Sequence, residues 1–132
     1  MSVRVLLFLL SFATVAGLHY IFIEFRLYDA ISWLDIPVHF FMGAVLGLGL
    51  VAMSDLSFRL GQLGTSWLVS LMVLVFLVVA WEVFGYLYLG SAARPDYLSD
   101  TMIDIVAGLS GGIIGLYLGH TLAILHNDIW QL

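Results

Sequence analysis

Residues 66–82 read SWLVSLMVLVFLVVAWE, and this stretch decides the fold class of the chain. The apolar run that begins at its second residue extends over residues 67–89, and a helix needs roughly 20 residues to cross a hydrocarbon core about 30 Å thick. Glu82 lies inside this run, where a charged side chain costs about 2.5–3.5 kcal/mol on insertion scales. Such residues are rare and usually face a partner or a wet cavity, so Glu82 is the first candidate for a functional site.

The composition of the whole chain places it among integral membrane proteins. The chain has 132 residues, of which 63% are hydrophobic and 10% charged, with a mean hydropathy of +1.12. It contains no cysteine, which excludes disulfides and thiolate metal sites. A net charge of −5 without a basic patch argues against nucleic acid as a partner. The expected surroundings are therefore the lipid bilayer.

Four apolar stretches of similar length follow one another along the chain, at residues 3–23, 36–53, 67–89 and 102–125. Backbone polar groups in lipid must be satisfied within the segment, which favours helices over isolated strands. We expect an all-α polytopic membrane protein with four transmembrane helices in an up-down bundle. Residues 1–132 then form a single transmembrane domain.

Four spans place both termini on one side of the membrane. The four arginines divide evenly between the two sides, so the positive-inside rule gives little help. Acidic residues concentrate on the side opposite the termini, and that side carries no excess of arginine. We therefore expect cytoplasmic termini, with the acidic face on the opposite side of the membrane.

Polar residues of the other spans lie at the same depth as Glu82. Asp35 and His39 open the second span, and Asp100 and Asp104 open the fourth, each pair with the i, i+4 spacing that places both side chains on one helix face. Each series then continues in glycine at the next two steps, at Gly43 and Gly47 and at Gly108 and Gly112. Small residues at this spacing let membrane helices approach closely. We expect the second and fourth spans to touch along their glycines, which would hold the polar ends together.

Three or four carboxylates with one or two histidines form an oxygen-rich ligand set. Such a set is suited to Zn²⁺, Mn²⁺, Fe²⁺ or Mg²⁺. The predicted metal ligands are Glu82, His39, Asp104, Asp35 and Asp100, and the predicted supporting residues are His19, Arg94 and Tyr86. No other cofactor is expected. A metal at this depth could bind or act on a lipid headgroup or an envelope precursor.

Other interpretations of the same residues stay open. Asp35 and Asp100 could be helix N-caps, His39 a packed core histidine, and Glu82 a hydrogen-bonded structural residue. The acids could instead relay protons along an ion pathway. A third alternative is a non-catalytic assembly subunit whose polar cluster is satisfied by a membrane-protein partner. Whether the protein is an enzyme stays open at this point.

The same residues carry a family resemblance. Three short motifs precede or lie beside glycine-rich helix segments. They are D-x-x-x-H-F at Asp35, His39 and Phe40, W-E at Trp81 and Glu82, and D-T-x-x-D at Asp100, Thr101 and Asp104. This pattern resembles the YjdF-like small inner-membrane proteins and is more distantly similar to the VanZ-like family linked to glycopeptide resistance. In the VanZ-like pattern, an arginine and an aspartate precede the last helix, and Arg94 and Asp100 would fill those positions. Ile36 departs from it, because a lysine usually follows the aspartate there. The resemblance implies the membrane class and the residue list, and no particular reaction.

Overall fold

The computed structural model describes residues 2–56, 66–88 and 97–129, with side chains up to residue 122. The four long helices are α1 (Val3–Glu24), α3 (Asp35–Ala52), α5 (Trp67–Tyr88) and α6 (Tyr97–Ile129), and three short ones are α2 (Leu27–Ala30), η1 (Ser32–Leu34) and η2 (Met53–Leu56). No strand occurs within these ranges. The predicted class, a helical membrane bundle, is confirmed: all four long helices are long and apolar enough to cross a membrane.

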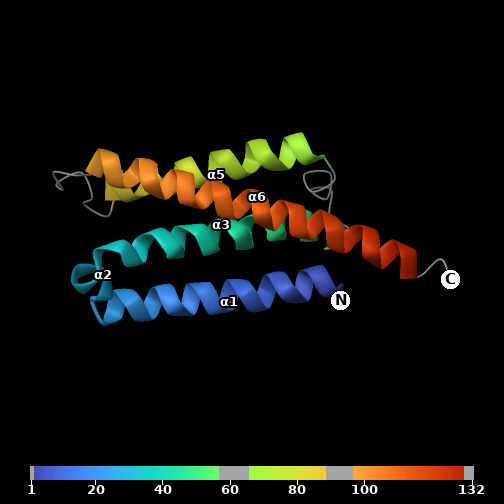
Figure 1. The fold of residues 1–132 in the computed structure, drawn as a ribbon, viewed down its shortest axis with the longest axis horizontal. Coiled ribbons are helices and arrows are strands. Elements are labelled where there is room, and N and C mark those ends of the chain that lie inside the picture. The colour runs from blue at the N-terminus through green and yellow to red at the C-terminus, as the bar shows by residue number, and fades with distance from the viewer. Residues whose placement is uncertain (1, 57–65, 89–96, 130–132) are drawn as a thin grey trace.

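The long helices alternate in direction. The start of α1 and the end of α6 lie at one end of the molecule, which we call the terminal end, and α2 lies at the other (Figure 1). The most extensive contact joins α3 to α6, while α1 packs mainly against α3 and α5 against α6. Large apolar side chains on the outer helices are exposed, including Leu68 at 65% and Phe76 at 70%, as expected for surfaces that face lipid.

Glycines bring α3 and α6 into backbone contact, as the sequence predicted. A Cβ atom on Gly43 would fall against the carbonyl oxygen of Gly108, and one on Gly111 against that of Phe40. Gly115 is in the same position relative to the carbonyl oxygen of Ala44. Only glycine therefore allows this separation of the helices.

Apolar side chains from three helices pack beside the glycine contact. The buried core cluster consists of Leu50, Val51, Leu74, Val78 and Leu116. This cluster joins α3, α5 and α6 between the terminal end and the middle of the bundle. It therefore holds the three helices together below their polar ends.

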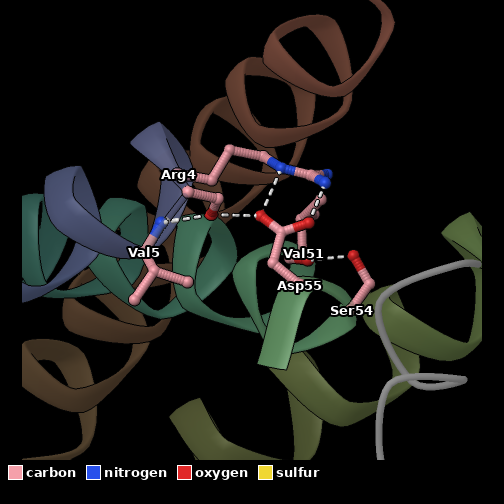
Figure 2. Close-up of polar contacts among 6 residues, drawn as sticks. Arg4, Val5, Val51, Ser54 and Asp55 are labelled. Carbon is pink, nitrogen blue, oxygen red and sulfur yellow. Dashed lines mark hydrogen bonds and ion pairs between the residues drawn. The ribbon is translucent and has the colours of Figure 1, made fainter. Parts of the chain in front are cut away.

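A polar contact fixes α1 at the terminal end (Figure 2). The guanidinium of Arg4 donates two hydrogen bonds to the carboxylate of Asp55, one of them from Nε at 2.9 Å. The hydroxyl of Ser2, which caps α1 by accepting from the Val5 N–H, donates to the same carboxylate. Both charged side chains are largely buried, at 13% and 16% exposure, so this contact fixes how α1 lies on the end of α3.

Helix boundaries at the opposite end differ from the prediction. η1 runs directly into α3, and Asp35 has helical backbone angles of φ −66° and ψ −41°, so it is not an N-cap. α6 begins at Tyr97, five residues before the predicted start, which places Asp100 in its first turn and Asp104 one turn further in. The aspartates thus project from continuous helices.

Candidate metal centre

His39 stands at the centre of a group of carboxylates at the α2 end of the bundle. Its Nε2 atom lies 3.4 Å from Asp35 Oδ1 and 4.0 Å from Asp104 Oδ2. Its Nδ1 atom lies 3.5 Å from Glu82 Oε1. We call these four residues the polar cluster. They come from α3, α5 and α6, so the structure brings together four of the five predicted ligands.

Three of the four residues of the polar cluster are largely buried, while the Asp35 side chain is 30% exposed. Asp104 is only 4% exposed, and the side chains of Glu82 and His39 are 12% and 15% exposed. Among the described residues, Asp104 Oδ1 and Glu82 Oε1 are buried without a hydrogen-bond partner. A buried carboxylate oxygen without a donor is costly, because desolvation of a charged group is not repaid.

The charges within the cluster are unbalanced. Three carboxylates surround one imidazole, which can contribute at most one positive charge. Of the arginines in the described ranges, Arg4 pairs with Asp55 at the terminal end, and Arg26 pairs with Asp29 at 2.8 Å. Neither of these two arginines pairs with the polar cluster, where protons or a bound cation would offset the carboxylate charge.

Three members of the cluster lie close enough together to be candidate ligands of one metal ion. One ligand atom each from Asp35, His39 and Asp104 can be chosen so that all lie within 4.8 Å of one another. Glu82 does not join this set, because it contacts the opposite nitrogen of the His39 ring. The imidazole thus separates Glu82 from the two aspartates.

The remaining predicted residues lie around the cluster or outside the description. Asp100 precedes Asp104 by one turn of α6 and is not part of the three-residue set. Tyr86 packs on Tyr97, with ring centroids 5.4 Å apart, and the Tyr97 hydroxyl donates to the backbone carbonyl of Glu82 at 3.1 Å. Tyr97 of α6 therefore joins α5 beside Glu82, and Tyr86 packs on its ring. Arg94 lies outside the described residues.

His19 has a partner that the sequence did not suggest. Its Nδ1 atom lies 2.6 Å from the hydroxyl of Tyr28 in α2. Burial, followed by the negative charge of Asp35, raises the pKa of Tyr28 to about 12, so its phenol stays protonated at neutral pH. This contact depends on the turn at Arg26, whose positive φ of 53° returns the chain towards α1. A lone tyrosine in a predicted loop gives no signal of such a contact.

An apolar cavity of about 350 Å³ lies directly beside the polar cluster. His19 and His39 both line it, and the rest of its wall is apolar and comes from all four long helices. Sequence periodicity gave no indication of this cavity.

Together, the fold and the cluster define a four-helix membrane protein with a buried acid/histidine centre at one end. The chain belongs to the family described as predicted membrane protein DUF2238, which matches residues 2–124. The YjdF-like proteins make up this family, so that resemblance is confirmed, whereas the VanZ-like one stays a prediction. No curated protein and no solved structure gives a significant match.

Proposed function

We propose that the polar cluster binds a divalent metal ion through Asp35, Asp104 and Nε2 of His39. The observation that carries this proposal is the buried Asp104 carboxylate, which has an unpartnered oxygen beside a histidine and two further acids. A divalent cation would offset two of the three carboxylate charges and give Asp104 a partner. Imidazole with carboxylates suits Zn²⁺ or Fe²⁺ best, with Mn²⁺ and Mg²⁺ as weaker candidates.

The spacing supports this assignment. Tetrahedral ligands at about 2.0–2.2 Å from one Zn²⁺ ion lie roughly 3.3–3.6 Å from each other. The three ligand atoms lie within 4.8 Å of one another, so side-chain rotations that shorten the longest separation by about 1 Å would complete the set.

Glu82 has a different role in this proposal from the one its sequence position suggested. Histidine ligands generally donate their second ring N–H to a carboxylate or carbonyl, which fixes the tautomer and the ring orientation. Glu82 Oε1 lies 3.5 Å from His39 Nδ1, on the side of the ring away from the aspartates. A side-chain shift that shortens this contact to a hydrogen bond would let Glu82 orient His39 and make it a better ligand, and loss of such a partner typically weakens metal affinity about 10–100-fold.

Three protein ligands leave coordination positions open, which is typical of catalytic and ligand-binding zinc sites. The cluster lies near one end of the membrane-spanning helices, which would bring it close to the lipid headgroups. We infer that the open position takes an oxygen of a lipid headgroup or envelope precursor. The metal would either hold this group or polarise it for reaction.

No observation favours the alternatives over a metal site. A proton pathway would need polar side chains deeper in the bundle. Below His39 and Asp104, the described α3–α6 contact consists of glycine and apolar residues instead. An assembly partner would have to reach a carboxylate that is already buried between three helices.

The proposed location is a bacterial inner membrane with both termini in the cytoplasm, which places the polar cluster in the outer leaflet. The family resemblance supports the location, and the acidic α2 end supports the orientation. A reporter that is active only in the cytoplasm should be active when it is fused after residue 132. Activity of a periplasm-specific reporter at the same position would reverse the orientation.

Elemental analysis of the detergent-purified protein tests the metal. We expect near-stoichiometric metal in the wild type, its loss in Asp104→Asn, and reduced affinity in Glu82→Gln. Asp29→Asn is the matched control, because Asp29 pairs with Arg26 on the surface at 66% side-chain exposure. A wild type without metal after supplementation, or an Asp104→Asn variant that keeps it, would overturn the proposal.

A further inference from the structure

The apolar cavity beside the polar cluster has the size and lining of a ligand site. Its volume of about 350 Å³ lies in the range of about 300–1,000 Å³ that small-molecule sites occupy. Its lining includes Phe12 of α1, Met42 and Leu46 of α3, and Leu77 and Trp81 of α5. Gly108 of α6 contributes backbone rather than a side chain, so the wall on that side is close to the helix axis.

The cavity joins the polar cluster directly. His39 is a wall residue of the cavity and the central residue of the cluster. His19 lines the same cavity from α1, where the Tyr28 hydroxyl holds its ring. The two histidines are the polar residues of an otherwise apolar lining. A ligand that fits must therefore combine one polar group with an apolar body.

Hydrocarbon chains of the bilayer can reach the cavity from the side. Phe12 and Trp81 line it from α1 and α5, and their side chains are 44% and 49% exposed on the lipid-facing surface. α1 packs mainly against α3, which leaves α1 and α5 as separate walls. Water would gain few hydrogen bonds inside, because apolar cavities stay dry or take apolar guests.

We propose that the cavity binds one hydrocarbon chain of a phosphate-bearing lipid, whose phosphate lies at the polar cluster. The chain contacts Met42, Leu46 and Leu77, and the phosphate takes the open metal position beside His39 and His19. This inference rests on the proposed metal, because three carboxylates without a cation would repel a phosphate. A divalent ion offsets two of the three carboxylate charges, and its open coordination position gives an anionic phosphate oxygen a direct ligand site.

The test uses purified, metal-loaded protein in detergent and three probes: oleoyl lysophosphatidic acid, inorganic phosphate and oleyl alcohol. The first probe carries both a hydrocarbon chain and a phosphate, the second carries only the phosphate, and the third carries only the chain. Dissociation constants are measured for the wild type and for Met42→Trp, which fills the cavity. The matched control is Met72→Trp, because Met72 is 65% exposed on α5 and does not line the cavity.

We expect the wild type to bind the lysolipid more tightly than either partial probe. Each methylene kept out of an apolar site costs roughly fourfold in affinity. Met42→Trp should therefore weaken lysolipid binding by about tenfold or more. Binding of inorganic phosphate should stay unchanged, and Met72→Trp should match the wild type.

A second pair of variants keeps the proposal testable if Met42→Trp fails to fold. Val38 lines the cavity, whereas Val83 is 50% exposed on α5, so Val38→Phe should act like Met42→Trp and Val83→Phe like the wild type. Metal content is measured on every variant. Unchanged lysolipid affinity in both filled variants, or a lysolipid that binds no better than phosphate, overturns the chain site while leaving the metal proposal intact. Absence of metal from the wild type overturns the metal proposal and, with it, the phosphate position.

Discussion

Alanine at Gly43 should separate the two central helices, because backbone rather than a flexible side chain occupies the space. The added Cβ would meet the carbonyl oxygen of Gly108 and lie 2.7 Å from its carbonyl carbon, whereas ordinary contacts are 3.4–4 Å. Gly111→Ala should act in the same way against Phe40. Gly17→Ala is the matched control, since its Cβ would meet nothing within 4 Å.

The magnitude follows from two opposing effects. Overpacking typically costs about 1–3 kcal/mol, and a rigid backbone obstacle belongs at the upper end of that range. Alanine is favoured over glycine in a helix interior by about 1 kcal/mol, which offsets part of the loss. The free energy of unfolding should therefore fall by about 2 kcal/mol in Gly43→Ala and Gly111→Ala. It should stay level or rise by up to about 1 kcal/mol in Gly17→Ala.

Gly43→Ala should also weaken metal binding, because Gly43 lies one turn below His39 in α3. A separation of the helices there would widen the gap of 4.0 Å between His39 Nε2 and Asp104 Oδ2. Unfolding by sodium dodecyl sulfate in mixed micelles, followed by tryptophan fluorescence, measures the stability, and metal titration measures the affinity. If Gly43→Ala and Gly17→Ala behave alike in both assays, the close contact between α3 and α6 is refuted.

Three further predictions concern other parts of the molecule. In chelator at neutral pH, Asp104→Asn should melt at a higher temperature than the wild type, since it removes a buried acid. Added metal should make the wild type the more stable of the two. If metal does not change which protein melts first, the reasoning is refuted. Tyr28 has a pKa of about 12 against 10.0 in the unfolded chain, so the folded state keeps a proton that the unfolded state loses, and stability should fall between pH 10 and pH 12. Tyr28→Phe should flatten that fall in urea- or detergent-unfolding curves, and an equally steep fall would contradict the assignment. Asp55→Asn should lower the free energy of unfolding by about 1.5–3 kcal/mol, because charged hydrogen bonds are lost. Arg4→Gln should lower it little further in the double variant, and full additivity of the two changes would argue against the Arg4–Asp55 pair.

Much of the fold was predictable because the bilayer restricts the possibilities. Segment length and hydropathy located all four spans, and the need to satisfy backbone groups excluded other architectures. The glycine contact was predictable because Gly43 and Gly108 each continue an i, i+4 series from a polar residue. The same series placed His39 and Asp104 at one depth, which is where the structure has them.

Other features depend on geometry that sequence spacing does not encode. The contact between Tyr28 and His19 needs the left-handed turn at Arg26, which has no glycine to announce it. The separation of Glu82 from the aspartates depends on the orientation of the His39 ring. The cavity arises from how side chains of four helices fail to fill a common space, which no single helix pattern contains.

An anomalous difference map at the absorption edge of the bound metal, from crystals of the protein grown in a lipid mesophase, tests the central claim most directly. The account predicts one peak at about 2.0–2.2 Å from His39 Nε2, with Asp35 and Asp104 as oxygen ligands and Glu82 hydrogen-bonded to Nδ1. A peak on the Glu82 side of the ring, or no peak in metal-supplemented crystals, would contradict it.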